Sequence, residues 1–393
     1  MFEERQRAAK QDDISRRRPT LALLGFLGLA LPGLSASQTS PRGFGDAADS
    51  VVVHKAVPRQ AFGIVLAYPP YLTLGGLRDD EREEFVAQHF FLTAAHLSDG
   101  RVVVLDENSL KFFDAKGNLL KVSGRHGLGP GEFRKTRDLC LLRGDTVMVV
   151  EDNNGRLSLW TPAGGFVREY SRPPGFKVFN SCREDATLLV RGGGSGGVGE
   201  YRAIRPDGVQ LRSLGRLAEP RYTSPFMYEP HVLPTARGYV VADARRFEHW
   251  IVNDRGQRVL TVRTGPPPPR MSESEWLAAA QRVFPGSSEA ALRLARGDTL
   301  RTRPAFSAMR VDPLGRVWIR DSDPPLSWIK NSNPPVSWTV FDAQGAIIGR
   351  ILLSPVGGPP RDIVRVGANY AVVKRIGGDG EVYLDFHKVL TSR

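Results

Sequence analysis

Residues 100–124 read GRVVVLDENSLKFFDAKGNLLKVSG: a β-rich run, a polar turn, a second β-rich run, and a hairpin that carries a glycine. The stretches DTVMVVEDNNGRLSLWTPAGGFVREYS, at 145–171, and GYVVADARRFEHWIVNDRGQRVLTVRTG, at 238–265, repeat this plan. Five copies are marked by their hairpin glycines, which are Gly117, Gly164, Gly208, Gly256 and Gly345. The first three intervals, 47, 44 and 48 residues, match the roughly 40–50 residues of a four-stranded propeller blade. The repeat therefore predicts an all-β propeller.

The interval between the last two hairpin glycines is 89 residues, about one blade longer than the others. An insertion explains the excess. Residues 270–300 predict two short helices, because Ser272 and Glu275 have the spacing of a capping box and apolar residues follow at helical intervals. The rest of the excess is a tandem duplication, SDPPLSW followed by SNPPVSW, over residues 322–338. We therefore expect a small helical insertion between blades 4 and 5.

The chain predicts a six-bladed β-propeller of four-stranded antiparallel blades. The blades are expected near residues 90–124, 137–171, 179–215, 229–264, 305–353 and 362–390. The sixth blade ends too early to hold a fourth strand of about 5 residues. We expect the β-prone run at 68–76 to close the ring as that strand, since an open edge favours aggregation. A seven-bladed ring is the alternative, if residues 51–76 supply more than one strand.

The stretch SGRHGLGPGEF, residues 123–133, followed by RDLCLLRGDTVMVVEDNNGRLSLW, resembles the inter-blade signature of bacterial six-bladed propellers related to NHL-repeat and TolB-like proteins. The resemblance implies the fold over about residues 71–389. It implies no activity, because such propellers include binding modules, scaffolds and a few enzymes. The glycine-rich stretch lacks the Lys-Ser or Lys-Thr ending of a phosphate-binding loop. We instead expect Phe133 to wedge between blades and Glu132 to accept backbone N–H bonds.

Residues 1–36 have the pattern of a signal peptide: arginines at 16–18, an apolar run of 14 residues, and LSAS as a cleavage point. Residues 37–67 are expected to be an N-terminal linker. The mature chain should hold no membrane span and act outside the cytoplasm, in the periplasm or the extracellular space. Its formal net charge of +12 for the full chain is spread over all blades, so we expect no specific nucleic-acid binding. We also expect the protein to be a monomer.

Two cysteines, Cys140 and Cys182, lie 42 residues apart in the predicted first strands of adjacent blades. An exported protein could oxidise them to a disulfide. Strict alternation along the strands instead sends the two side chains to different faces. Two buried thiols are therefore the alternative.

The sequence contains no recognisable catalytic motif, and its seven histidines are dispersed. We expect binding at the channel face that carries the helical insertion and the duplicated loop, because long loops on a rigid scaffold usually carry function. Polar residues that begin the innermost strands would converge beneath these loops, and aromatic residues would form walls. The candidates are Arg137, Asn180, Tyr228, Glu229, His231, Trp328, Trp338 and Arg365.

Two classes of function follow. The first is an exported, non-catalytic propeller that binds a protein, peptide or glycan and uses no cofactor or metal. The alternative is a metal-dependent hydrolase or lyase of lactonase type, with its site in the central channel. That enzyme needs several oxygen ligands around one axis. The sequence offers Asp138, Asn180 and Glu229 as donors.

Overall fold

Each repeat of the sequence forms one four-stranded antiparallel sheet, so the prediction of a six-bladed propeller is confirmed. The structure is a computed structural model. The residues described are 50–58, 60–86, 92–151, 156–171, 176–192, 198–218, 230–266, 268, 270–284, 286–296, 302–321, 336–353 and 361–391.

The first three blades follow one another along the chain. Blade 1 is β4 Thr93–His96, β5 Val102–Asp106, β6 Ser109–Phe113 and β7 Leu119–Ser123. Blade 2 is β8 Thr136–Leu141, β9 Val147–Glu151, β10 Arg156–Trp160 and β11 Phe166–Ser171. Blade 3 is β12 Phe176–Cys182, β13 Leu188–Gly192, β14 Val198–Ile204 and β15 Gln210–Ala218. Short 3₁₀ turns lie at Glu81–Glu83, before blade 1, and at Arg143–Asp145, between β8 and β9.

The last three blades also recruit strands from the N-terminal part of the chain. Blade 4 is β16 Pro230–Thr235, β17 Gly238–Asp243, β18 Glu248–Asn253 and β19 Arg258–Thr264, with β1 Ser50–His54 added. Blade 5 is β20 Phe306–Val311, β21 Val317–Asp321, β22 Val336–Phe341 and β23 Ile347–Leu353. Blade 6 is β24 Arg361–Val366, β25 Tyr370–Ile376 and β26 Val382–Thr391, with β2 Ile64–Leu66 and β3 Leu72–Gly75 added.

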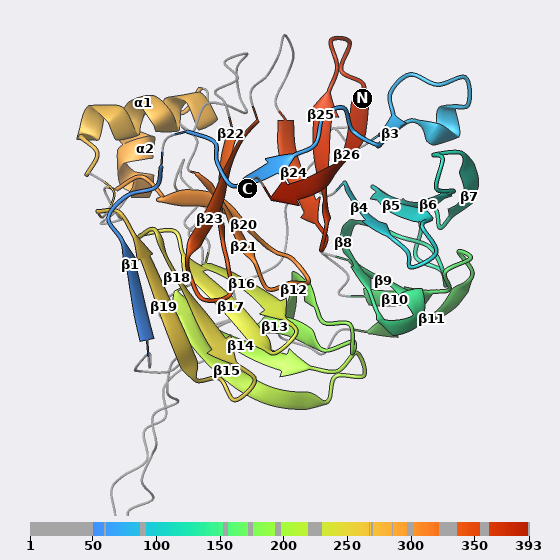
Figure 1. The fold of residues 1–393 in the computed structure, drawn as a ribbon, viewed down its shortest axis with the longest axis horizontal. Helices are drawn as coiled ribbons and strands as arrows, with labels where there is room; N and C mark the ends of the chain where they lie inside the picture. Colours follow the sequence, from blue (N-terminus) through green and yellow to red (C-terminus); the bar gives the residue numbers. More distant parts are fainter. Residues whose placement is uncertain are drawn as a thin grey trace, which may run out of the picture. The chain divides into compact units, whose positions relative to one another are not determined.

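The first strands of the blades form a closed inner ring. Contacts run from β4 to β8, β12, β16, β20 and β24 and return to β4, and Figure 1 shows these strands nearest the centre of the ring. Apolar clusters of the described residues lie at each of the six interfaces between neighbouring blades. Sheets that bury apolar side chains on both faces against their neighbours form a rigid support for a central site.

The hairpin glycines have the backbone conformation that the repeat requires. All five that mark the repeat have φ between +75° and +90°, a region that residues with a Cβ rarely occupy. Gly164 adds a packing reason, because a Cβ there would lie 2.7 Å from the Ser123 hydroxyl of blade 1. The inter-blade stretch at 123–133 also makes the contacts that the sequence predicts. Phe133 is fully buried, and Glu132 accepts the Gly129 N–H at 2.8 Å.

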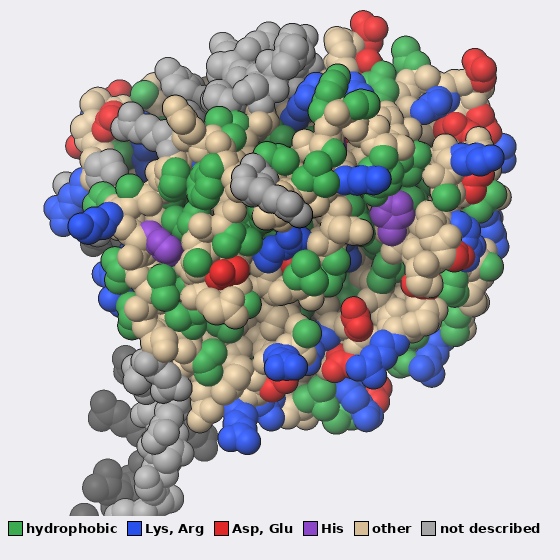
Figure 2. All heavy atoms as spheres, viewed as in Figure 1, with side chains coloured by type: hydrophobic (Ala, Val, Ile, Leu, Met, Phe, Trp, Pro, Cys, Tyr) green, Lys and Arg blue, Asp and Glu red, His purple; other side chains and the backbone are tan. Residues whose placement is uncertain are grey.

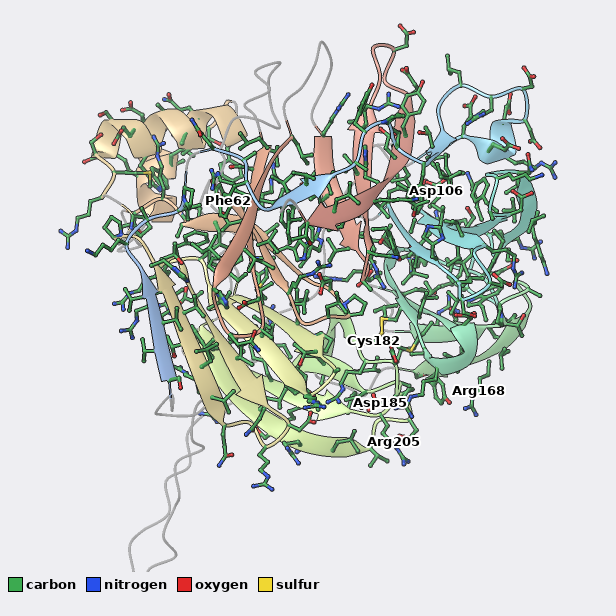
Figure 3. All side chains as sticks on the ribbon, viewed as in Figure 1. Phe62, Asp106, Arg168, Cys182, Asp185 and Arg205 are labelled. Atoms are coloured by element: carbon green, nitrogen blue, oxygen red, sulfur yellow. A yellow bond between two sulfur atoms is a disulfide. The ribbon has the colours of Figure 1, made fainter. Side chains whose placement is uncertain are left out.

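The N-terminal part of the chain runs along the outer edges of blades 4, 5 and 6. The β1 strand pairs in parallel with β19, Phe62 bridges to Arg350 of β23 (Figure 3), and β2 and β3 both pair with β26. The expected linker at 37–67 is therefore corrected, because its described residues include β1 and β2. These strands extend existing sheets rather than build another, so three strands within residues 50–75 leave the ring with six blades.

The helical insertion lies between β19 and β20, as predicted. It contains α1 Glu273–Val283 and α2 Glu289–Arg296, and Ser272 and Glu275 form the expected capping box. The two helices bury their own apolar cluster around Trp276 and Leu292. Neither helix is long and apolar enough to span a bilayer, and the same holds for every described helix.

Candidate functional site

A cavity of about 620 Å³ lies on the axis of the ring. All six blades contribute to its wall, chiefly through their first strands, and Arg137, Arg310 and Arg365 are the basic side chains that these strands supply. The turns between the first and second strands also line it, with Arg143 in blade 2 and Asp185 in blade 3 as examples. Pockets of this volume hold small-molecule ligands.

The position of these turns corrects the expected face of the site. In an antiparallel blade, the turn between the first two strands and the loop between the second and third strands lie at opposite ends. The helical insertion precedes β20, and the duplication follows β21, so both belong to the other end. The cavity that the described residues outline therefore reaches the face opposite the elaborated loops.

The structure separates the eight candidate site residues. Arg137 and Arg365 line the cavity. His231 is not among the lining residues and packs against the ring of Phe306, 5.6 Å between centroids. Trp338 belongs to β22, is fully buried between blades 5 and 6, and forms no aromatic wall. The remaining candidates lie outside the described residues or, in β12, have undescribed side chains: Asn180, Tyr228, Glu229 and Trp328.

Cys140 and Cys182 form a disulfide between the first strands of blades 2 and 3, with their Cα atoms 6.2 Å apart (Figure 3). The argument from strict alternation against this bond is wrong. Both strands shift register before the cysteine, β8 between Thr136 and Asp138 and β12 between Val178 and Cys182. Side chains therefore do not alternate strictly along these strands, and both cysteines line the cavity.

Charged groups in the wall are held in a water-poor environment. Burial raises the pKa of the Asp138 carboxyl, although the nearby Arg365 and Arg310 act in the opposite direction. Burial also lowers the pKa of the Arg310 guanidinium. Asp362 of β24, which is not among the lining residues, also has its pKa raised by burial, although Arg320 forms an ion pair with it at 3.1 Å. Buried charges interact more strongly than exposed ones because the surrounding medium screens them less.

An aromatic cluster lies beside the cavity where blade 6 meets blade 1. The Tyr71 hydroxyl and His96 Nε2 are 2.7 Å apart, and the His96 and Tyr370 rings pack edge to face at 4.8 Å. Burial lowers the pKa of His96, and it raises the pKa of Tyr71 to about 12. Both groups are therefore neutral near pH 7. Of the three residues, His96 and Tyr370 line the cavity.

Arg310 is the main site residue that the sequence analysis missed, and the repeat itself carried the signal. Arg310 lies two residues before Asp312, which opens the turn of blade 5, and Arg365 lies two residues before Gly367, which opens the turn of blade 6. The two arginines are therefore equivalent positions of neighbouring blades. Blade 1 has Ala95 at this position.

The described residues contain no group of three or more His, Cys, Asp or Glu side chains that could hold a metal ion. Of the three donors suggested for a lactonase-type site, Asp138 is described, and the side chains of Asn180 and Glu229 lie outside the described part of the chain. Basic side chains on the face shown in Figure 2 interleave with acidic and apolar ones and form no continuous patch.

The chain was compared with known proteins. It matches no family model and no curated protein. A structure from Bacteroides fragilis, named as an exported protein, is similar with a TM-score of 0.51 at 10% identity, covering 88% of this chain and 100% of that one. A duf4221-family structure from Bacteroides vulgatus has a TM-score of 0.47 at 11% identity, with 84% and 99% covered. Virginiamycin B lyase from Staphylococcus aureus gives 0.40 at 11%, with 78% and 84% covered.

At these identities the first of the three likenesses supports the propeller fold and nothing about activity. The exported label and the lyase activity are properties of those proteins.

Proposed function

We propose that this chain is an exported, non-catalytic propeller that binds a small ligand in its central cavity. The cavity carries the proposal: a space of about 620 Å³ is enclosed by first strands from six blades and holds charged side chains among apolar ones. Ligand pockets combine such apolar walls with a few polar groups that orient the ligand. Because packed blades support the wall, binding needs little rearrangement.

Export is supported by two features. The disulfide between Cys140 and Cys182 is of a kind that persists in oxidising compartments and is rare in the cytosol. Residues 1–36 have the pattern of a signal peptide. The relationship to NHL-repeat and TolB-like propellers is likewise a proposal, supported by the stretch at 123–133.

The elaborated face is a second proposed surface, for a protein, peptide or glycan. This second surface is proposed because two insertions occur at the same end of blade 5. The helical insertion precedes β20, and the duplicated sequence follows β21. The duplicated loop at 322–335 lies outside the described residues. The rim that it forms with the helices therefore stays a prediction.

Closing the cavity tests the main proposal. Ala368 lies in the turn of blade 6 and lines the cavity, so Ala368→Trp should fill the mouth. Ala343→Trp, in an exposed turn of the same ring, is the matched control. We expect saturation-transfer NMR with a library of neutral and charged fragments to detect saturable binding to the wild type and to Ala343→Trp, and none to Ala368→Trp. Equal binding to all three proteins would contradict the cavity as the site.

The lactonase-type enzyme is tested by a separate measurement. Purified protein supplied with calcium or magnesium is incubated with lactones and esters, with and without a chelator. Turnover that the chelator abolishes would replace the binding proposal with the enzyme.

A further inference from the structure

Two arginines occupy equivalent positions of neighbouring blades and face the same cavity. Arg310 and Arg365 are each the fifth residue of a first strand, β20 and β24. Burial lowers the pKa of the Arg310 guanidinium, Asp362 and Asp138 act in the opposite direction, and the charges of Arg320 and Arg365 add to the lowering. The guanidinium groups of Arg310 and Arg365 therefore lie within electrostatic range of each other. Like charges held together in a poorly hydrated wall destabilise the protein unless an anion compensates them.

The described partners of both guanidinium groups are neutral. Arg310 donates from Nε to the Val364 carbonyl at 3.3 Å and from Nη1 to the Met309 carbonyl at 2.9 Å. Arg365 donates from Nη1 to the Leu139 carbonyl at 3.1 Å. Behind Arg310, the ring of Trp338 lies 5.9 Å from the guanidinium carbon. These contacts orient the cations without neutralising them.

Acidic groups near the two arginines are too few to balance them. Asp138 is the one carboxylate that the described first strands supply to the cavity wall, and Arg137 in the same strand also acts on it. Burial favours the neutral form of Asp138. Asp362 also acts on Arg310, but it forms an ion pair with Arg320. The first strands thus bring more positive than negative charge to the cavity.

The charges at the mouth are more evenly matched. Arg143 and Arg183 stand near Glu184 and Asp185, and Arg183 is paired with Asp254 at 2.5 Å. A further lining carboxylate, Asp312, accepts from the Trp318 indole at 2.9 Å and pairs with Arg316. The unbalanced positive charge therefore lies within the ring, away from the mouth.

The wall also contains many apolar side chains. Side chains from several blades contribute, among them Leu141, Leu233, Met309, Pro313, Val364 and Tyr370. A ligand that fills this space gains stability by burying apolar surface, at about 25 cal/mol per Å². A small inorganic ion would leave most of the wall uncovered.

We infer that the cavity binds a small organic anion, whose carboxylate or phosphate group is held by Arg310 and Arg365 and whose body packs against the apolar wall. The inference rests on the proposed function and adds the chemical class of the ligand. Guanidinium groups suit both oxyanions, because each can donate two parallel hydrogen bonds to them.

Isothermal titration calorimetry with matched probes tests the inference on the full mature protein. The probes are 4-phenylbutyrate, its neutral amide, phenyl phosphate and inorganic phosphate. We expect 4-phenylbutyrate or phenyl phosphate to bind at least tenfold more tightly than the amide and than inorganic phosphate. The stronger of the two separates a carboxylate ligand from a phosphate ligand.

Two variants assign the effect to the arginines. Arg310→Met and Arg365→Met keep an unbranched apolar stem and remove the charge; Arg205→Met, at an exposed turn where Arg205 pairs with Asp207, is the control. Each cavity variant should lose at least tenfold in anion affinity with amide affinity unchanged. The ligand-free melting temperature of Arg310→Met should stay equal or rise, because an uncompensated buried charge is removed.

The outcomes separate the two proposals. Equal binding of the amide and the anions would overturn the inference and leave the binding cavity in place. Absence of saturable binding by every probe would contradict both. A lower ligand-free melting temperature of Arg310→Met, with amide and anion affinities reduced alike, would show that the arginine is structural and overturn the inference.

Discussion

Buried charged side chains of this propeller differ in how fully their neighbours compensate them. Asp312 is almost completely buried, yet it accepts hydrogen bonds from the Leu314 and Arg316 backbone N–H groups and from the Trp318 indole. Its charge is stabilised by the protein itself. Arg310 has carbonyl hydrogen-bond partners among the described residues, and the charges of Asp362 and Asp138 act on it. This difference separates a structural group from a candidate binding group.

His249 provides a prediction about pH. Its ring is 1% exposed and packs edge to face on Phe341. Burial lowers its pKa from 6.5 to about 3. The unfolded chain therefore binds a proton that the folded protein excludes, and stability falls as the pH drops from 6.5 toward 3.

The contribution of His249 should be about 1.4 kcal/mol per pH unit in this range. Urea unfolding at pH 7, 6 and 5 measures it, and His249→Leu should flatten the pH dependence by that amount. The exposed His126→Leu is the control. An unaltered slope in His249→Leu would show that this ring is protonated as easily in the folded state as in the unfolded chain.

At the level of strands, the N-terminal part of the chain completes blade 6. Leu74 of β3 is 1% exposed, pairs with Leu384 of β26, and belongs to the cluster between blades 6 and 1. We expect Leu74→Ala to reduce the free energy of unfolding by about 2–5 kcal/mol. Val51→Ala in β1, at a side chain that is 53% exposed, should change it far less. Similar small losses in both variants would mean that β3 lies outside the cooperative core.

The disulfide links two neighbouring blades at the cavity wall. It closes a loop with a sequence separation of 42, for which restriction of the unfolded chain gives a stabilisation of about 2–4 kcal/mol. We expect the double variant Cys140→Ala/Cys182→Ala to lose that amount in urea unfolding under oxidising conditions. Adding a reductant should lower the stability of the wild type and leave that of the variant unchanged. If the reductant lowered the stability of both proteins equally, its effect would not come from this disulfide, and the prediction would be wrong.

The duplicated loop provides a prediction about the second surface. Removing Asp323 to Ser332 deletes one copy of the duplication. We expect the fold to persist and capture of a protein or glycan partner from an extracellular extract to be lost, with a chelator having no effect. Melting temperature is the control for the fold. Unchanged capture by the shortened protein would remove the loop from the binding surface.

For the whole molecule, the proposed export would place the cysteines in an oxidising compartment. The mature chain should begin near Ser37, if the run before it is cleaved as a signal peptide. N-terminal sequencing of the native protein tests this expectation. An intact Met1 on protein recovered from the cytosol, with both thiols reduced, would contradict it.

Much of the fold could be predicted because it depends on local patterns that recur. Hairpin glycines with positive φ repeated at blade intervals, Ser272 and Glu275 had capping-box spacing, and the short sixth blade called for another strand. Each of these signals concerns the backbone of a few neighbouring residues or the length of one unit. The propeller, its blade count and the helical insertion could therefore be predicted from the sequence alone.

The site required the tertiary structure, because its side chains converge from strands hundreds of residues apart. Arg365 donates to the Leu139 carbonyl across a separation of 226 residues, and Cys140 and Cys182 are bonded although strict alternation predicts different faces. Trp338 was predicted to form an aromatic wall of the site, but it lies in the core. The reason is similar, because its side chain packs against the neighbouring blade. Spacing along the chain specifies the strands. The closed ring determines which side chains share the cavity and which carboxylates lie near its arginines.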